Sequence, residues 1–116
     1  LEDKELSELI LCNADNSIIK NVRIYGNGSN GVFVYRTDNS TFLNLNSLKN
    51  TCGISLYHSN NNSIEFSNLS FNEFYGIYLY ESDNNIIKNN NIKGNLKENI
   101  YLEKCKNNLF EKNKLS

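Results

Sequence analysis

The chain has 116 residues, which suits a single domain, and a formal net charge of −1, which gives no indication of binding to nucleic acid or to an anionic membrane surface. Hydrophobic residues make up 39% of the chain, and asparagine is the most abundant residue. No apolar run approaches the roughly 18 residues that a membrane-spanning helix needs, so membrane insertion is not expected. A core can form from so few apolar side chains only if the chain arranges them regularly.

The sequence repeats with a period of 22 or 23 residues, and each unit starts at an anchor residue. The five anchors, which are glycine in the three central units, are Glu8, Gly31, Gly53, Gly76 and Asn99. Such fixed-period repetition is typical of stacked repeat proteins, in which no single unit buries its own apolar face. A left-handed hexapeptide helix would have a period of about 18 residues and does not fit.

A short strand follows each anchor, with apolar residues one and three positions after it. These strands cover residues 9–11, 32–34, 54–56, 77–79 and 100–102. After a polar turn, a second strand places one apolar residue per unit at Ile19, Phe42, Ile64, Ile87 and Phe110. Five residues later comes another apolar column, formed by Ile24, Leu48, Leu69, Ile92 and Leu115. Leu48 is in register with this column if one residue is inserted near Ser47.

Alternation with a period of two indicates β-strands, and four columns of like residues indicate that the strands stack in parallel. These features predict an all-β, right-handed, single-stranded parallel β-helix of about five coils, because parallel β crossovers are almost always right-handed. Residues 1–116 form one domain in this prediction. Residues 1–7 resemble the end of a preceding coil, so we expect the chain to be a segment of a longer solenoid.

An asparagine occurs eight residues after every anchor, in the polar turn between the two strands. The five residues are Asn16, Asn39, Asn61, Asn84 and Asn107. Asparagine tolerates the left-handed backbone conformation that a tight bend requires. In stacked coils the amides would lie about 4.8 Å apart, and we expect them to hydrogen-bond to one another as an asparagine ladder. A second polar column is expected at Asn27, Asn50, Asn72 and Asn95.

The three cysteines, Cys12, Cys52 and Cys105, lie at different phases of the repeat and are expected to stay unpaired. Cys105 falls at a small, inward-facing position that the other units fill with Ala14, Thr37, Ser59 and Ser82. The only imidazole is that of His58, so neither a metal site nor another cofactor is expected.

The unit at residues 76–92 reads Gly-Ile-Tyr-Leu-Tyr-Glu-Ser-Asp-Asn-Asn-Ile-Ile-Lys-Asn-Asn-Asn-Ile. It resembles the repeats of the right-handed parallel β-helices of the pectin-lyase-like superfamily. It is most similar to their asparagine-rich NosD-type branch of carbohydrate-binding and sugar-hydrolase proteins, and the resemblance extends over residues 7–116. The resemblance implies the same fold and a location outside the cell or on its surface, while the repeated residues themselves build only the scaffold.

The resemblance also implies where catalytic acids would lie. In the polygalacturonase-like branch, catalytic aspartates precede the glycine-led strand on neighbouring coils, and here only Glu98 is acidic at that position. The pair of facing carboxylates that glycosidases need is therefore missing. Arg36, His58 and Glu81 form another candidate set for proton transfer, five residues after their anchors, although solvated turn residues explain them more simply. The sequence favours a non-catalytic protein over an enzyme.

The outward-facing positions of the first strands carry six aromatic residues. They are Phe33, Tyr35, Tyr57, Tyr78, Tyr80 and Tyr101. In stacked coils they would form an exposed strip, and aromatic rings with a polar edge are well suited to pack against sugars. The alternative is that aromatic residues simply favour strands and shield the sheet.

The main hypothesis is therefore a non-catalytic structural or binding β-helix module of a surface or secreted protein, with glycan binding through the aromatic strip. One alternative is a polysaccharide-active enzyme, such as a lyase, hydrolase or epimerase, or a fragment of one. Another alternative is a protein whose copies stack end to end as a homo-oligomer.

Overall fold

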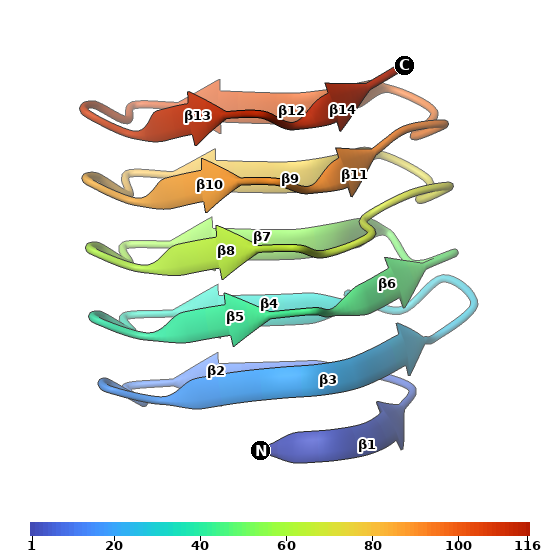
Figure 1. Cartoon of the computed structure of the whole chain (residues 1–116), viewed down its shortest axis with the longest axis horizontal. Coiled ribbons are helices and arrows are strands. Elements are labelled where there is room, and N and C mark those ends of the chain that lie inside the picture. The colour runs from blue at the N-terminus through green and yellow to red at the C-terminus, as the bar shows by residue number, and fades with distance from the viewer.

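The chain folds into a parallel β-helix of about five coils, as the sequence predicts (Figure 1). The computed structural model describes residues 1–116 and contains strands and turns but no helix, so no helix is available to cross a membrane. In Figure 1 the chain runs to the right along the front, returns to the left along the back and rises with each coil, which makes the helix right-handed.

Fourteen strands make up the coils. They are β1 (Glu2–Leu6), β2 (Leu9–Cys12), β3 (Ile18–Tyr25), β4 (Val32–Tyr35), β5 (Thr41–Leu43), β6 (Asn46–Leu48), β7 (Cys52–Tyr57), β8 (Ser63–Glu65), β9 (Tyr75–Tyr80), β10 (Ile86–Lys88), β11 (Asn91–Ile92), β12 (Glu98–Glu103), β13 (Leu109–Glu111) and β14 (Lys114–Leu115). The first strands of the coils form a five-stranded parallel sheet in the order β12-β9-β7-β4-β2. The second strands form another sheet in the order β1-β3-β5-β8-β10-β13, with β6 beside β3, and β11 pairs with β14.

The register places equivalent residues of successive coils beside one another. In the five-stranded sheet, Val32 pairs with Ile54, and Ile54 pairs with Ile77. Side chains of neighbouring parallel strands point the same way at paired positions, so the apolar columns become continuous ridges. Two sheets of such ridges face each other across the interior. The side chains at the outward positions of each strand point away from the core and can contact solvent or a ligand.

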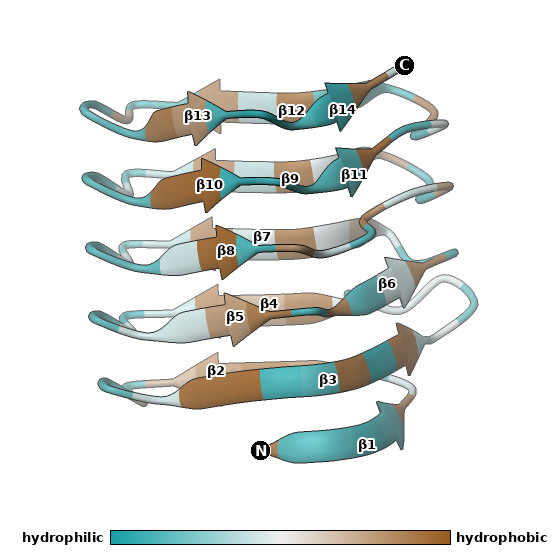
Figure 2. Ribbon diagram, viewed as in Figure 1, coloured by the Kyte–Doolittle hydropathy of each residue, from teal (hydrophilic) through white to brown (hydrophobic).

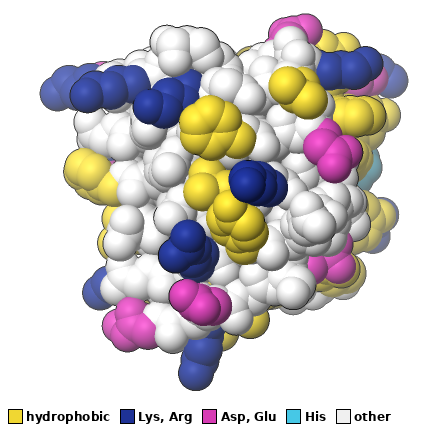
Figure 3. All heavy atoms as spheres, turned by 90° about the vertical axis from the view of Figure 1, so that its right-hand side faces the viewer, with side chains coloured by type: hydrophobic (Ala, Val, Ile, Leu, Met, Phe, Trp, Pro, Cys, Tyr) yellow, Lys and Arg dark blue, Asp and Glu magenta, His cyan; other side chains and the backbone are white.

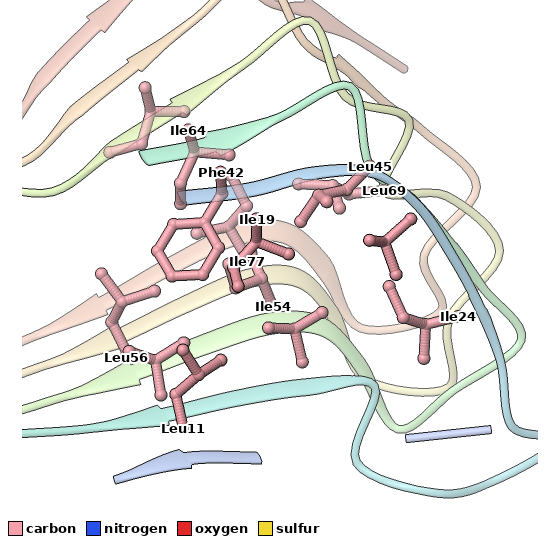
Figure 4. Close-up of a cluster of buried hydrophobic side chains, with 14 of the residues drawn as sticks. Leu11, Ile19, Ile24, Phe42, Leu45, Ile54, Leu56, Ile64, Leu69 and Ile77 are labelled. Carbon is pink, nitrogen blue, oxygen red and sulfur yellow. The ribbon is translucent and has the colours of Figure 1, made fainter. Parts of the chain in front are cut away.

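The core consists of sixteen buried hydrophobic residues between these sheets. Figure 4 shows Ile54, Ile77 and Leu56 from the five-stranded sheet pointing toward Phe42, Ile64 and Leu69 from the opposite side. The hydropathy colouring in Figure 2 shows a hydrophilic β1 at one end, while β10 within the stack carries apolar residues.

One apolar column differs from the prediction. Ser47, and not Leu48, pairs with Ile24, and Ser47 is fully buried while Leu48 is only partly buried. The coil has no inserted residue near Ser47. Instead, the turn between Ser47 and Gly53 is shorter than the equivalent turns of the other coils. The Ser47 hydroxyl donates a hydrogen bond to the Gly53 carbonyl oxygen at 2.7 Å, which satisfies a polar group at this position. Sequence reasoning also missed the inward-facing Leu45, which is buried beside this column.

The predicted asparagine ladder was placed one residue too early. The five predicted asparagines adopt the expected left-handed conformation, with φ between 56° and 60°, but their side chains are exposed and make no hydrogen bonds to one another. They are Asn16, Asn39, Asn61, Asn84 and Asn107. The bend turns these side chains outward, so the residue that follows each of them points into the coil instead. The amide of Asn85 accepts the backbone N–H of Asn62 at 2.8 Å and donates to the Ser59 carbonyl at 3.2 Å.

Four inward-pointing polar columns share this arrangement, in which each side chain accepts a backbone N–H of the preceding coil. The columns are Thr37, Ser59, Ser82 and Cys105; Ser40, Asn62, Asn85 and Asn108; Ser67, Asn90 and Asn113; and Asn50, Asn72 and Asn95. The inward position predicted for Cys105 and the column of Asn50, Asn72 and Asn95 are confirmed, while Asn27 lies outside that column and is exposed. These bonds satisfy backbone groups at the corners, where the sheets are interrupted.

Candidate functional site

The outward face of the five-stranded sheet carries two parallel columns of side chains. The first column contains Phe33, Ser55, Tyr78 and Tyr101. The second contains Tyr35, Tyr57, Tyr80 and Glu103. Serine thus takes the place of an aromatic ring at the middle coil of the first column. Because Ser55 is small and lies between two aromatic residues, the sheet face is hollowed at this point.

A pocket of about 460 Å³ opens here. Its lining consists of Asn30, Phe33, Thr51, Cys52, Ser55, Tyr57, Phe74, Tyr75, Tyr78, Tyr101 and Glu103. Cys52 and Ser55 are the most buried of these residues, with 8% and 5% of their surfaces exposed. The volume is within the range of small-molecule sites, about 300 to 1,000 Å³, and the mixture of aromatic rings and a few polar groups is also typical of such sites.

Aromatic rings pack against one another along one side of the pocket. The rings of Tyr75 and Tyr101 stack with their centroids 5.0 Å apart and an angle of 10° between their planes, and Tyr78 stacks on Tyr101 at 5.6 Å and 13°. On the other side, Phe33 stacks on Tyr57 at 5.0 Å, and Tyr57 meets Tyr78 edge-on at 5.5 Å. These contacts fix the rings in place, so the aromatic surface is preorganised for a ligand.

A hydrogen bond connects two coils at the edge of this pocket. The phenol of Tyr78 in β9 donates to Oε1 of Glu103 in β12 at 3.0 Å. Burial raises the pKa of Tyr78 most, and the hydrogen bond and charge of Glu103 raise it further. The phenol therefore stays protonated at neutral pH and acts as a donor, while the second carboxylate oxygen of Glu103 has no partner within the protein and can accept a hydrogen bond from a ligand.

Burial also raises the pKa of Cys52, whose thiol lies in the same pocket. A buried thiol with a raised pKa is protonated and a poor nucleophile at neutral pH. Cys52 therefore acts as part of the apolar lining, and its chemistry does not indicate covalent catalysis.

The structure divides the six aromatic residues predicted for a binding strip into two groups. Phe33, Tyr57, Tyr78 and Tyr101 line the pocket. Tyr35 and Tyr80 lie outside the lining and pack edge-on against His58, with centroid distances of 5.9 Å and 5.8 Å.

Sequence reasoning missed other lining residues, among them Phe74, Tyr75, Ser55 and Glu103. Tyr75 directly precedes its glycine anchor, a position at which the family resemblance implies catalytic acids and not aromatic residues. The signal that could have revealed the pocket is the small residue Ser55, which interrupts the aromatic residues Phe33, Tyr78 and Tyr101 at equivalent positions of the neighbouring coils.

The catalytic candidates lie apart from the pocket. His58 Nδ1 lies 3.3 Å from Glu81 Oε2, and both side chains are 40% exposed. The guanidinium of Arg36 lies over the ring of its neighbour Tyr35, 5.2 Å from the centroid. Glu81 lines a separate open hollow of about 490 Å³ together with Asp83, Lys104, Cys105 and Lys106. The structure thus brings His58 and Glu81 together at the surface, and no enclosed cavity lies against the pair.

Glu98 is exposed at the start of β12, where it pairs in register with Tyr75. Asp15, Asp38 and Asp83 lie at equivalent positions in the polar turns of their coils, and each accepts a backbone hydrogen bond from a neighbouring coil. Asp15 accepts the N–H of Asp38 at 2.8 Å, and Asp38 accepts the N–H of Asn60 at 2.7 Å. No group of three or more His, Cys, Asp or Glu side chains is arranged to hold a metal ion.

The turns that lead into the five-stranded sheet carry exposed apolar side chains. Phe71, Phe74 and Leu96 are exposed here, and the ammonium group of Lys97 lies over the Phe74 ring, 5.2 Å from its centroid. Figure 3 shows a hydrophobic cluster with Lys or Arg side chains beside it on this side of the molecule. Phe74 belongs both to this cluster and to the pocket lining, so the apolar surface continues from the turns into the pocket.

The geometry defines a parallel β-solenoid with an aromatic pocket on the outward face of its five-stranded sheet. The chain belongs to the right-handed β-helix family, since residues 8–116 match the family described as right handed beta helix region. A search of curated proteins finds no match.

One solved structure with a similar fold is the A-module of the mannuronan C-5 epimerase AlgE6 of Azotobacter vinelandii. The TM-score is 0.75 with 17% sequence identity, and the similar region covers 91% of this chain. The chain spans about a third of the length of that structure, 34%. At this identity the likeness shows the fold alone.

Proposed function

We propose that this chain is a non-catalytic glycan-binding β-helix module, and that the pocket around Ser55 is its binding site. The observation that carries the proposal is the gap at Ser55 between aromatic residues of neighbouring coils, which leaves a half-open hollow walled by stacked tyrosines. This site is narrower than the six-residue strip that the sequence predicts, and it adds polar groups that the strip lacked.

The lining matches the two chemical faces of a sugar ring. The C–H faces of a pyranose can pack against the aromatic surfaces of Tyr57, Tyr75 and Tyr101, which bury apolar area. The ring hydroxyls need hydrogen-bond partners in the same pocket. Glu103 offers a free carboxylate oxygen, and Asn30 and Thr51 offer an amide and a hydroxyl at the rim.

The position of the site on a rigid sheet supports a binding role over a catalytic one. A single carboxylate, Glu103, lines the pocket, whereas glycosidic hydrolysis generally uses two facing carboxyl groups. The phenol of Tyr78, which hydrogen-bonds to Glu103, has a raised pKa and stays protonated near neutral pH, so it is a poor general base.

The test is binding of the protein to a panel of immobilised oligosaccharides, with a variant that fills the pocket. Ser55→Tyr would restore the aromatic column, and the chain should tolerate it because Phe33 and Tyr78 occupy the same position on the neighbouring coils. The wild type should bind at least one glycan, and Ser55→Tyr should abolish that binding. Tyr35→Ala is the matched control, since this tyrosine lies outside the lining. Binding that survives Ser55→Tyr would exclude this site.

A polysaccharide-active enzyme is the second candidate. It is supported by the close contact of His58 with Glu81 and by the similar fold of a module from a mannuronan C-5 epimerase. Incubation of the protein with polysaccharides and analysis of the products tests this candidate. Turnover that disappears in Glu81→Gln but persists in Ser55→Tyr would replace the binding proposal with an enzymatic one.

End-to-end stacking of copies is a third candidate and fits the ladders less well. Each inward polar side chain accepts an N–H from the preceding coil, so a coil placed after the last one must supply acceptors. The first coil of a second copy would offer Ala14 at one ladder position and Lys4, which pairs in register with Val22, at another, and neither has a side-chain acceptor. Light scattering at rising protein concentration tests this candidate.

We also propose that the module acts outside the cell or at its surface, where glycans are displayed. This location, together with the NosD-type branch of the pectin-lyase-like superfamily, follows from the resemblance of the repeats. Fractionation of cells that produce the natural protein would test the location directly.

A further inference from the structure

We propose that the pocket selects uncharged sugars and rejects uronates, an inference that rests on the glycan-binding function proposed above. The argument depends on the charges that surround the pocket and on the hydrogen-bonding state of the one carboxylate within it.

Glu103 is the only charged residue that lines the pocket. One of its oxygens accepts the phenolic hydrogen of Tyr78 at 3.0 Å, which holds the carboxylate in place against the pocket wall. The other oxygen has no partner in the protein. A carboxylate can only accept hydrogen bonds, so its ligand must bring donors, and sugar hydroxyls are such donors.

A second carboxylate belongs to Glu98, the first residue of β12, which pairs in register with Tyr75 of the aromatic wall. The effect of both negative charges reaches this ring. Burial raises the pKa of Tyr75 most, and the nearby charges of Glu98 and Glu103 raise it further. A positive group on this side is Lys97, whose ammonium lies 5.2 Å from the centroid of the Phe74 ring and outside the pocket lining.

The pocket thus has no Arg or Lys in its lining to pair with a ligand carboxylate, and arginine or lysine is the usual partner for such a group. A uronate bound among the tyrosines would bring its own negative charge close to Glu103. Its carboxylate would lose its hydration without forming an ion pair with an arginine or lysine. Like-charge contacts and unpaired buried charges both oppose binding. An uncharged hexose with the same ring configuration would keep the aromatic packing, and one of its hydroxyl groups could donate a hydrogen bond to Glu103.

The experiment compares each glycan that the protein binds with its own oxidised form. Selective oxidation of the C6 hydroxyls to carboxylates converts a neutral hexose oligosaccharide into a uronate with the same linkages. Titration calorimetry should show that oxidation weakens binding at least about tenfold. Glu103→Gln removes the charge but keeps a hydrogen-bond acceptor. It should reduce the ratio of the two affinities, because the neutral glycan binds more weakly and the oxidised glycan is no longer repelled.

Three outcomes separate the two proposals. Weaker binding of the oxidised glycan, with the ratio reduced in Glu103→Gln, supports the inference. Equal or tighter binding of the oxidised glycan, still blocked by Ser55→Tyr, overturns the preference for uncharged sugars while the glycan-binding function stands. Failure of the protein to bind any neutral or oxidised glycan of the panel overturns both.

Discussion

The phenol of Tyr78 donates a hydrogen bond to the carboxylate of Glu103 on the next coil, 3.0 Å away. This contact joins two coils at the wall of the pocket and combines an aromatic surface with a fixed acceptor. The contact also helps to raise the pKa of Tyr78 in the folded state, so its effect can be measured as a change of stability with pH.

The stability of the protein should fall at alkaline pH, chiefly because burial raises the pKa of Tyr78 and also because of this hydrogen bond. The folded state raises the pKa of Tyr78, and also those of Tyr57 and Tyr75, above the ordinary value of about 10. A raised pKa of an acid means that the folded protein holds the proton more tightly than the unfolded chain does. The stabilisation is therefore fully present below about pH 10 and is lost as the pH rises above that value. Urea unfolding between pH 8 and pH 12, in steps, measures the fall.

Tyr78→Phe tests whether Tyr78 causes part of this fall. Phenylalanine keeps the ring stacking but removes the titrating group, so the free energy of unfolding should decline less steeply with pH than in the wild type. An identical decline in the two proteins would show that other groups cause it.

The inward amide of Asn85 should contribute far more to stability than its exposed neighbour Asn84. Asn85→Ala removes an acceptor for the Asn62 N–H and a donor for the Ser59 carbonyl, which leaves buried polar groups unsatisfied. At about 1–3 kcal/mol for each of these two unsatisfied groups, the free energy of unfolding should drop by about 2–6 kcal/mol. The matched control is Asn84→Gly, which keeps the left-handed conformation and should change little. Equal losses in the two variants would contradict the assignment of the ladder to Asn85.

Gly76 should not tolerate a methyl group. A Cβ at this position would overlap the Ile92 side chain and lie 2.8 Å from the Leu69 carbonyl oxygen. We expect Gly76→Ala to lower the free energy of unfolding by about 1–3 kcal/mol through overpacking, as measured by the midpoint of urea unfolding. An unchanged midpoint would mean that the corner of the coil has room for a side chain.

The thiol of Cys52 reports on the occupancy of the pocket. Burial and its raised pKa should make Cys52 react with iodoacetamide much more slowly than the exposed Cys12. A bound glycan should slow the reaction of Cys52 further and leave Cys12 unchanged, which mass spectrometry of the digested protein can follow. Equal protection of both thiols would indicate a general effect of the sugar and not a ligand in this pocket.

The sequence was sufficient to predict the coil, its period and most of its core, because stacking repeats the same constraint five times. The columns that begin with Leu9 and Ile19 follow from that repetition, and the register of the strands confirms them. The amide ladder was misplaced because two adjacent asparagines, such as Asn84 and Asn85, carry the same signal. Only the left-handed φ of 58° at Asn84 decides which side chain points inward.

The pocket was less predictable because it depends on a departure from the repeat. The aromatic columns are visible in the sequence, but the hollow comes from Ser55, and its far wall comes from Phe74 in the preceding turn and Tyr75 at the start of β9. Side-chain packing, such as the stacking of Phe33 on Tyr57 across the gap, determines which rings enclose the space. Spacing along the chain does not specify these orientations.

The most direct test of the account is a titration of isotope-labelled protein with a bound glycan, followed by the shifts of its backbone amide signals in nuclear magnetic resonance spectra. The account predicts that the amides of Cys52, Ser55, Tyr78 and Glu103 shift together with one affinity, and that those of Asn39 and Asn61 on the opposite turn do not. Shifts confined to the surroundings of His58 and Glu81, with the amide of Ser55 unchanged, would contradict it.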